Sequence, residues 1–189
     1  MIRSGALECL LINNGNTQLL DELAGGQLAD AFATSRTLTE LVLDEVLFWD
    51  DAAAAASIVR ALTGHPSLES LNLSFNSPPE DGVAGAAALL GQLVAANAPA
   101  LKELSVKASH LGDEGLRPAF QALPRNTHLR KLDCWSTGSS RQFARDVVLP
   151  AVRVNTSLRT LTANNPGTDA PALDEAAELV DARSFEADE

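Results

Sequence analysis

The sequence predicts a right-handed α/β solenoid of about six strand-turn-helix repeats, with a parallel sheet on its concave side and helices outside. A phrase of the form Leu-x-x-Leu-x-Leu recurs every 28 to 33 residues, and each copy precedes turn residues and a helical apolar pattern. A period of this length indicates stacked units that bury their apolar faces against one another. Hydrophobic residues make up 46% of the 189 residues and aromatic residues only 4%, so the core must consist of Leu, Val and Ala.

Each copy of the phrase predicts one strand. The clearest copy is Leu68-Glu69-Ser70-Leu71-Asn72-Leu73, and the six first positions are Leu7, Leu38, Leu68, Leu101, Leu129 and Leu158. Alternate residues of a strand point to opposite faces, so the leucines face the core and the residues between them face the open side. The constant strand-turn-helix order predicts a parallel sheet with helices along one side.

The segments between the phrases predict the helices. Apolar residues predict a first helix over 19–32, interrupted or bent at Gly25-Gly26. Asp50-Asp51 predicts the N-terminal cap of a second helix over 52–62. The third helix is expected from Val83 to a stop at 97–99, and the fourth over 111–123. The fifth begins near Ser140 and should kink or end at Pro150, because proline lacks the N–H and clashes with the preceding turn.

The two ends of the array differ. A last helix over about 171–183 carries outward acidic residues, as a C-terminal cap should. Residues 1–183 are therefore expected to form one domain, and the acidic residues 184–189 a disordered tail. The N-terminus offers no comparable cap. Either the first helix shields that end or the chain is the C-terminal piece of a longer protein, and we favour the second interpretation.

The repeats resemble the ribonuclease-inhibitor-like class of leucine-rich repeats. The segment 111–116, Leu-Gly-Asp-Glu-Gly-Leu, is similar to the strand-to-helix turn of that class, and 126–129 and 155–158 are similar to its approach to the next strand. The resemblance implies a curved, protein-binding horseshoe. It also implies Asn or Cys at the ninth position of each phrase, where the side chain satisfies backbone groups. Only Asn76 fits. The equivalent residues are mostly unable to fill this role, so several turns are expected to be irregular, with water or other backbone groups in its place: Gly15, Val46, Ser109, Thr137 and Pro166.

The candidate binding residues are those predicted on the open face. Exposed aromatic side chains beside charged ones are typical anchors of protein interfaces. The candidates are Trp135, Phe75, Lys131, Lys107, Glu103, Asp133, Glu40 and Asp44. Two alternatives stay open: Phe75 tucks under the Pro78-Pro79 loop, and Trp135 covers the fifth helix. Trp49 is a further candidate.

Charge is distributed unevenly between the repeats. Basic residues gather in the later repeats (Lys102, Lys107, Arg130, Lys131 and Arg159) and acidic ones in the second (Glu40, Asp44, Glu45, Asp50 and Asp51). A dipolar face of this kind would steer a partner with a matching pattern, and a solvated mixture of charges is the alternative.

Composition argues against several classes of function. The formal net charge of −11 disfavours nucleic-acid binding, and no apolar run reaches the roughly 20 residues of a membrane-spanning helix. The three histidines lie in different repeats without zinc-ligand spacing, and no phosphate-binding glycine loop occurs. No cofactor, metal or catalytic residue is therefore expected.

The two cysteines predict free thiols. Cys9 and Cys134 lie four repeats apart, or roughly 19 Å at about 4.8 Å per strand, well beyond the roughly 7 Å that a disulfide allows. Cys134 replaces the sixth-position leucine as a small apolar residue. Free thiols favour a cytoplasmic address, and delivery into a host cell as an effector is also open.

The leading hypothesis is a non-enzymatic module that binds a protein partner on its concave face, as a monomer or as part of a larger chain. The alternatives are a GTPase-activating accessory role, for which Asn76 is the only candidate, and a scaffold or regulatory domain of a larger protein. The repeat pattern predicts a binding surface and leaves the partner unidentified.

Overall fold

The chain forms a single parallel sheet whose strands follow sequence order. The computed structural model describes residues 7–13, 15, 21–163 and 171–186, with side chains to residue 183. The strands are β1 (Cys9–Asn13), β2 (Glu40–Asp44), β3 (Ser70–Asn72), β4 (Glu103–Ser105), β5 (Lys131–Asp133) and β6 (Thr160–Thr162). Their order in the sheet is β1-β2-β3-β4-β5-β6, and each pair is parallel. The predicted α/β class and parallel sheet are confirmed.

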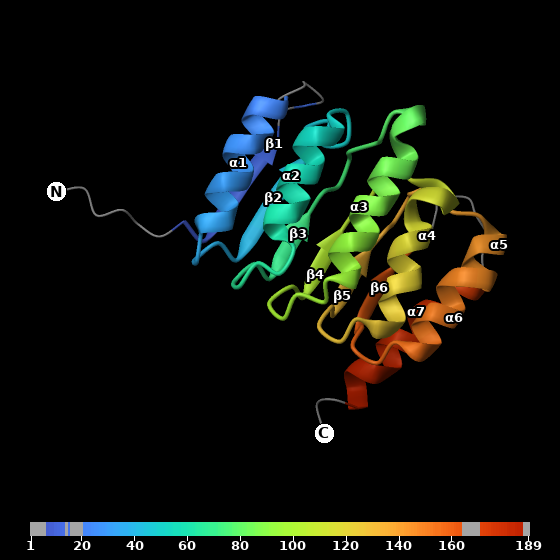
Figure 1. Ribbon diagram of the computed structural model, residues 1–189. Helices are drawn as coiled ribbons and strands as arrows, with labels where there is room; N and C mark the ends of the chain where they lie inside the picture. The colour runs from blue at the N-terminus through green and yellow to red at the C-terminus, as the bar shows by residue number, and fades with distance from the viewer. Residues whose placement is uncertain (1–6, 14, 16–20, 164–170, 187–189) are drawn as a thin grey trace.

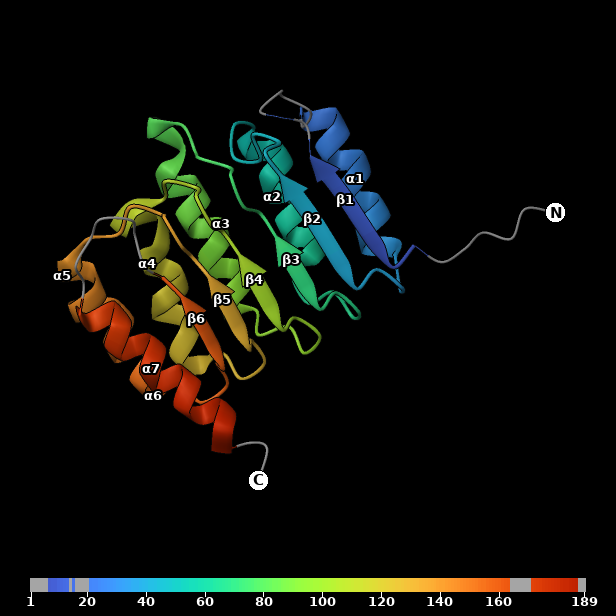
Figure 2. The same ribbon diagram turned by 180° about the vertical axis from the view of Figure 1, so that it is seen from behind.

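Helices connect the strands along one face of the sheet and leave the other face open, as the two opposite views show (Figures 1 and 2). The α-helices are α1 (Glu22–Thr34), α2 (Ala52–Leu62), α3 (Val83–Ala95), α4 (Gly112–Ala122), α5 (Arg141–Phe143), α6 (Leu149–Val154) and α7 (Pro171–Glu186). Short helices of other types are η1 (Glu80–Gly82), η2 (Leu123–Arg125) and η3 (Ala144–Val148). The last of these is a π-helix.

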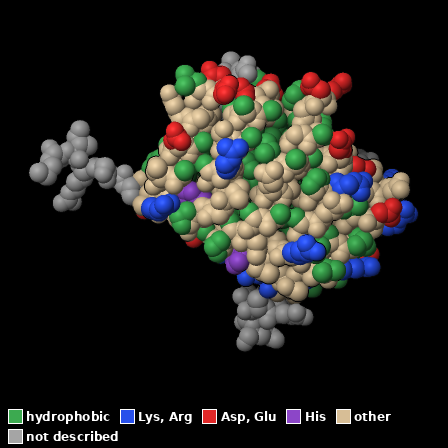
Figure 3. Space-filling view, viewed as in Figure 1, with side chains coloured by type: hydrophobic (Ala, Val, Ile, Leu, Met, Phe, Trp, Pro, Cys, Tyr) green, Lys and Arg blue, Asp and Glu red, His purple; other side chains and the backbone are tan. Residues whose placement is uncertain are grey.

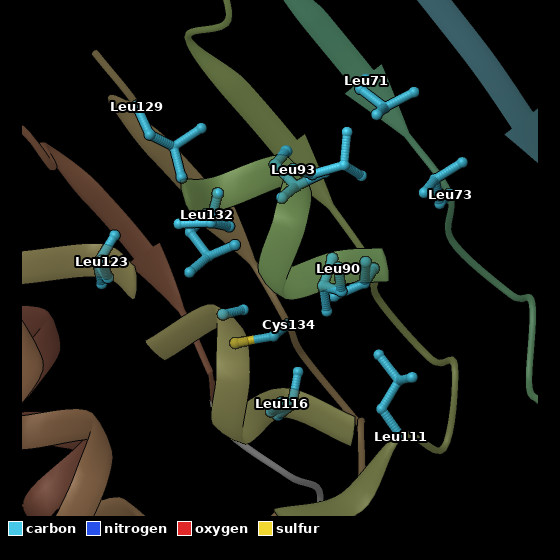
Figure 4. Close-up of a cluster of buried hydrophobic side chains, with 14 of the residues drawn as sticks. Leu71, Leu73, Leu90, Leu93, Leu111, Leu116, Leu123, Leu129, Leu132 and Cys134 are labelled. Carbon is cyan, nitrogen blue, oxygen red and sulfur yellow. The ribbon is translucent and has the colours of Figure 1, made fainter. Parts of the chain in front are cut away.

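The core lies between the sheet and the helices. The fourth-position leucines stand in register from β2 to β6 and are at most 5% exposed: Leu41, Leu71, Leu104, Leu132 and Leu161. Figure 4 shows leucines of β3 and β5 beside those of α3 and α4. Cys134, at a sixth position, is 1% exposed in this cluster, which confirms it as an apolar substitute.

The predicted bend at Gly25-Gly26 is wrong, because α1 runs through both glycines. A Cβ atom on Gly25 would lie 2.4 Å from Cβ of Ala54 in α2, whereas Gly26 has open space around it. Gly25 therefore lets two helices approach closely instead of breaking one.

The prediction that Pro150 ends the fifth helix is also wrong. Helical structure continues from Arg141 to Val154, with the π-helix η3 immediately before Leu149 and Pro150. A π-turn shifts the backbone register locally, which is one way in which a helix accommodates a residue without an N–H.

Side chains at the ninth positions bind backbone groups more widely than predicted. Asn76 is 0% exposed: Oδ1 accepts from the N–H groups of Val46 and Phe48, and Nδ2 donates to the carbonyls of Leu43, Leu73 and Ser74. The buried hydroxyls of Ser109 and Thr137 also donate to backbone carbonyls. Two of the positions predicted to be unable to fill this role therefore contribute to it.

A second set of buried polar residues lies three positions before the first leucine of a phrase. Asn126 accepts from the N–H of Leu129 and donates to the carbonyl of Val94, and Asn155 bonds to the equivalent groups of its own unit and of the unit before it. His65 takes the same place, with Nδ1 accepting from Leu68 N–H. These side chains tie three of the helix-to-strand loops to the preceding unit, in addition to the bonds made at the ninth positions.

The two ends of the sheet differ in how far they are covered. In α7, Asp174, Glu175, Glu178 and Asp181 are exposed, as predicted for a capping helix, and α7 packs on α6 and β6. The helix includes residues 184–186, so the first half of the predicted tail is helical; residues 187–189 lie outside the described residues. At the other end, Leu11 of β1 is 65% exposed and Leu23 of α1 is 71% exposed.

Acidic side chains gather where the helices begin. Figure 3, which shows the helix side, has most red atoms along the edge at which α2 and α3 start. Acidic residues at helix starts include Glu22, Asp51, Glu80, Asp81, Asp113 and Glu114. This placement complements the positive end of each helix dipole. Among the described residues, no helix is long and apolar enough to cross a membrane.

Candidate functional site

A hollow of about 290 Å³ lies on the open face of the sheet, above β3. Its floor consists of small polar side chains, namely Ser70, Asn72 and Ser74 of the third unit and Ser105 of β4. Longer side chains of the neighbouring units form the walls. The hollow arises because small residues on one strand face longer ones on the strands at either side.

Backbone geometry at the end of the strand brings Phe75 to this hollow. Phe75 has φ of 58°, and Glu45, Ala108 and Ser136 take the same left-handed conformation at the same position of their units. For a bulky residue this conformation costs about 1–3 kcal/mol. The turn leaves Phe75 40% exposed at the hollow, although simple strand alternation would send an eighth-position side chain toward the core.

Lys107 joins the two aromatic candidates. Its Nζ atom lies 5.7 Å from the centroid of the Phe75 ring and 5.1 Å from that of Trp135. Both distances are within the range of cation–π attraction, which contributes about 0.5–1 kcal/mol at an exposed site. Three consecutive units therefore supply one aromatic–cation–aromatic cluster, Phe75–Lys107–Trp135, named here the aromatic clamp.

The backbone also fixes Trp135. The carboxylate of Asp133 accepts a hydrogen bond from the Trp135 N–H at 3.0 Å, and Asn72 holds Ser74 N–H in the same way. The main-chain N–H of Ala108 donates to the carbonyl of Trp135. Asp133 therefore positions the clamp as well as lining the hollow.

Acidic side chains form much of the hollow's wall. The carboxylate of Glu103 pairs with Lys131 Nζ at 3.4 Å, with both side chains about half exposed. The carboxylate of Glu40 accepts a hydrogen bond from the Cys9 thiol, which raises the pKa of that thiol. One oxygen of Asp44 accepts from Asn13 Nδ2 at 3.2 Å. Its other oxygen is buried and has no hydrogen-bond partner among the described residues.

The structure brings the eight predicted site residues together. Seven of them line the hollow, and Trp135 adjoins it through Lys107. Sequence reasoning placed Ser70, Asn72, Ser74 and Ser105 on the open face but did not select them. The signal that marked them was their small size among longer side chains: Ser70, Asn72 and Ser74 belong to the third unit, and Ser105 lies beside them on β4.

The predicted basic cluster on this face is wrong for three of its members. Lys102 Nζ donates to the carbonyl of Pro99, Arg130 to that of Ser157, and Arg159 to that of Thr156. These side chains bind the loops that lead into the strands. Only Lys107 and Lys131 of the predicted cluster line the hollow.

The two further candidates, Trp49 and Asn76, lie in the core, and so does His65. Trp49 is 4% exposed and packs edge-on against Phe48 in the core, so it is not available as a surface anchor. Asn76, the residue considered for a GTPase-activating role, is fully buried and bonded to backbone groups. His65 is buried at 3% exposure.

Both cysteines are free, as predicted, with Cys9 exposed and Cys134 buried. Burial raises the pKa of the Cys134 thiol to about 12, so this group stays protonated in the folded protein. Within the described residues, no group of three or more His, Cys, Asp or Glu side chains is arranged to hold a metal ion.

Solved structures with a similar fold include two protein domains. The tropomodulin C-terminal domain of Caenorhabditis elegans has a TM-score of 0.52 and 17% sequence identity, over 95% of this chain and 87% of that chain. Leiomodin-1 actin-binding site 2 has a TM-score of 0.50 and 14% identity, over 95% of this chain and 82% of that chain. No family model and no curated protein matches the chain. At these identities the likeness shows a shared fold.

The assignment to the ribonuclease-inhibitor-like class is wrong, because the similar structures are tropomodulin and leiomodin domains. The chain also lacks the regular ninth-position asparagines that this class implies, and Asn76 alone occupies that position as asparagine. Short phrases near a turn, such as 111–116, fit any unit in which a strand leads into a helix. They are too local to identify the class.

Proposed function

We propose that the chain is a non-enzymatic binding domain that holds a protein partner on the open face of its sheet. In this proposal the six units stack as a solenoid whose concave side carries the hollow and the aromatic clamp. The observation that carries the proposal is the clamp itself. Phe75 is 40% exposed in a costly left-handed conformation, and Lys107 contacts both aromatic rings. Exposed aromatic side chains that are held in place are the usual energetic centres of protein interfaces.

The similar structures support a protein partner as the class of ligand. The leiomodin-1 structure is described as an actin-binding site, so a fold of this kind binds a protein in at least one other chain. Actin is therefore the first partner to test. That this chain binds actin is itself a proposal, because a similar fold at 14% identity does not imply that two proteins bind the same partner.

The test compares the affinity for actin of the wild-type chain with that of the Phe75→Ala, Trp135→Ala and Lys107→Met variants. We expect each substitution to weaken binding by about tenfold, which corresponds to about 1.4 kcal/mol. Lys107→Met keeps an apolar chain against the rings and removes only the charge. Thermal unfolding by circular dichroism shows whether each variant is folded.

Val154→Ala is the matched control, because Val154 is also apolar and 62% exposed but lies at the end of α6 on the helix side. Its affinity should equal that of the wild type. Actin binding that survives all three open-face substitutions would contradict the site. If the wild type does not bind actin, actin is excluded and the same variants are used with partners captured from a lysate.

A further inference from the structure

We propose that the partner presents an arginine side chain that enters the hollow above β3, next to an apolar group that packs against Phe75. This inference rests on the proposed function and specifies the chemistry of the partner. It follows from three properties of the open face: the shape of the hollow, its charge, and the positions of Glu40 and Glu103.

The shape of the hollow suits one extended side chain. Its volume of about 290 Å³ lies just below the roughly 300–1,000 Å³ typical of small-molecule sites. The floor over β3 is polar, and Ser74 and Ser105 share a hydrogen bond of 2.8 Å between their hydroxyls. The exposed ring of Phe75 borders the hollow and offers an apolar surface beside it.

The net negative charge of the hollow favours a cationic ligand. Four carboxylates line it, Glu40, Asp44, Glu103 and Asp133, against the two ammonium groups of Lys107 and Lys131. Lys131 is engaged by Glu103, and Lys107 lies against the rings of the clamp. The lining therefore keeps an excess of two negative charges.

The register of the strands places two of these carboxylates on either side of one point. Glu40 of β2 and Glu103 of β4 are both in register with Ser70 of β3. Neighbouring strands lie about 4.8 Å apart, so the two Cα atoms are roughly 10 Å apart with a small side chain between them. A cation above Ser70 is then within reach of both glutamates.

Arginine fits this arrangement better than lysine. A guanidinium is planar and presents five N–H donors, so it can bond to carboxylates on two sides at once and stack on an aromatic ring. An ammonium is a compact, strongly hydrated charge that loses more hydration on entering such a hollow. The open face therefore recognises an arginine next to an apolar residue on the partner.

The experiment uses Nα-acetyl-arginine amide as the probe and follows backbone amide shifts of the full chain by NMR. We expect saturable shifts centred on Glu40, Ser70 and Glu103. The citrulline analogue has nearly the same shape without the charge and should give no saturable shift at these amides. The lysine analogue should bind about fivefold more weakly, because its ammonium cannot form the paired hydrogen bonds.

Variants localise the binding. Glu40→Gln should lower the affinity for the probe by about fivefold. Glu114→Gln makes an equal charge change on the helix side and should leave the affinity unchanged. Lys131→Met frees the Glu103 carboxylate and should strengthen binding by about twofold or more, and Arg60→Met is its matched control. Equal binding of arginine and citrulline, or shifts centred on the acidic residues of α1 instead, would overturn the proposal.

The probe needs no partner, so this outcome is separate from that of the proposed function. Loss of actin or lysate binding leaves the arginine result standing. Conversely, if the arginine probe does not bind the hollow, the arginine proposal is wrong. The role of the aromatic clamp is then decided by the protein-binding experiments alone.

Discussion

Single residues in the loops determine how one unit is fixed to the next. His65 is the clearest case: Nδ1 accepts from the N–H of Leu68, so Nε2 carries the proton and donates to the carbonyl of Phe32 at 3.1 Å. Asn126 and Asn155 make equivalent bonds with an amide. The sequence showed only that the three histidines lie in different repeats. It did not indicate that His65 is buried, because burial of a polar side chain depends on the neighbouring unit.

The equivalence of His65 with the loop asparagines can be tested by substitution. His65→Leu should lower the free energy of unfolding by about 2–4 kcal/mol, because it leaves a buried N–H and a buried carbonyl without partners. His65→Asn should lose less than half as much, since an amide can accept from Leu68 and donate nearby. Urea denaturation measures both. An asparagine variant as unstable as the leucine variant would show that the loop bonds are not interchangeable.

The two thiols should differ in reactivity. At pH 8, a thiol reagent should label one equivalent quickly at the exposed Cys9, and the second, Cys134, only after unfolding. The buried thiol also makes stability depend on pH. Its pKa is raised in the folded state to about 12 from 9.0, so the unfolded state ionises first as pH rises.

The corresponding stability is fully present below pH 9 and is lost as the pH rises from about 9 toward 12. Cys134→Ala should remove this component, so the difference in stability between wild type and variant should shrink over that interval. A difference that stays constant from pH 8 to pH 11 would contradict the assignment of the raised pKa to Cys134.

At the scale of elements, close helix packing explains where the sequence-based prediction failed. Two adjacent glycines indicated a bend in α1, yet only Gly25 meets a neighbour, Ala54, and the helix is continuous. Likewise, Pro150 indicated a helix end, but the helical backbone continues through Pro150, directly after the π-helix η3. A single sequence does not reveal which neighbouring element a residue will touch, and that contact decided both cases.

The two glycines of α1 therefore provide a matched pair. Gly25→Ala should destabilise the protein by about 1–3 kcal/mol, because its Cβ would overlap Ala54 in α2. Gly26→Ala should stabilise it by up to about 1 kcal/mol, because the site is open and alanine favours the helix. Denaturant unfolding of the two variants checks the signs. Effects of the same sign would contradict the packing of α1 on α2.

At the scale of the molecule, the repeat period was enough to predict six parallel strands and their order along the chain. It also predicted the leucines that face the core, except in the first unit, where Leu7 is 55% exposed. It also placed the eight candidate residues on one face, where the structure brings them together at the hollow. The period could not predict the left-handed turn that exposes Phe75, because such a turn has no fixed residue type: Glu45, Ala108 and Ser136 share it. It also could not distinguish one class of repeat from another.

Basic and acidic side chains occupy different parts of the molecule. Arginines and lysines at the second positions of the later phrases bind loop carbonyls, while acidic residues line the hollow on the open face. The helix side carries acids at the helix starts. The open face is thus the surface on which aromatic groups, an exposed lysine and excess carboxylates occur together.

The central claim is that the open face binds a protein partner through the aromatic clamp. Its most direct test is quantitative capture from a lysate with four baits: wild type, Phe75→Ala, Lys107→Met and the helix-side control Val154→Ala. We expect at least one protein to be captured equally by wild type and Val154→Ala, and its capture to fall by about tenfold with both open-face variants. Partners retained equally by all four baits would contradict it.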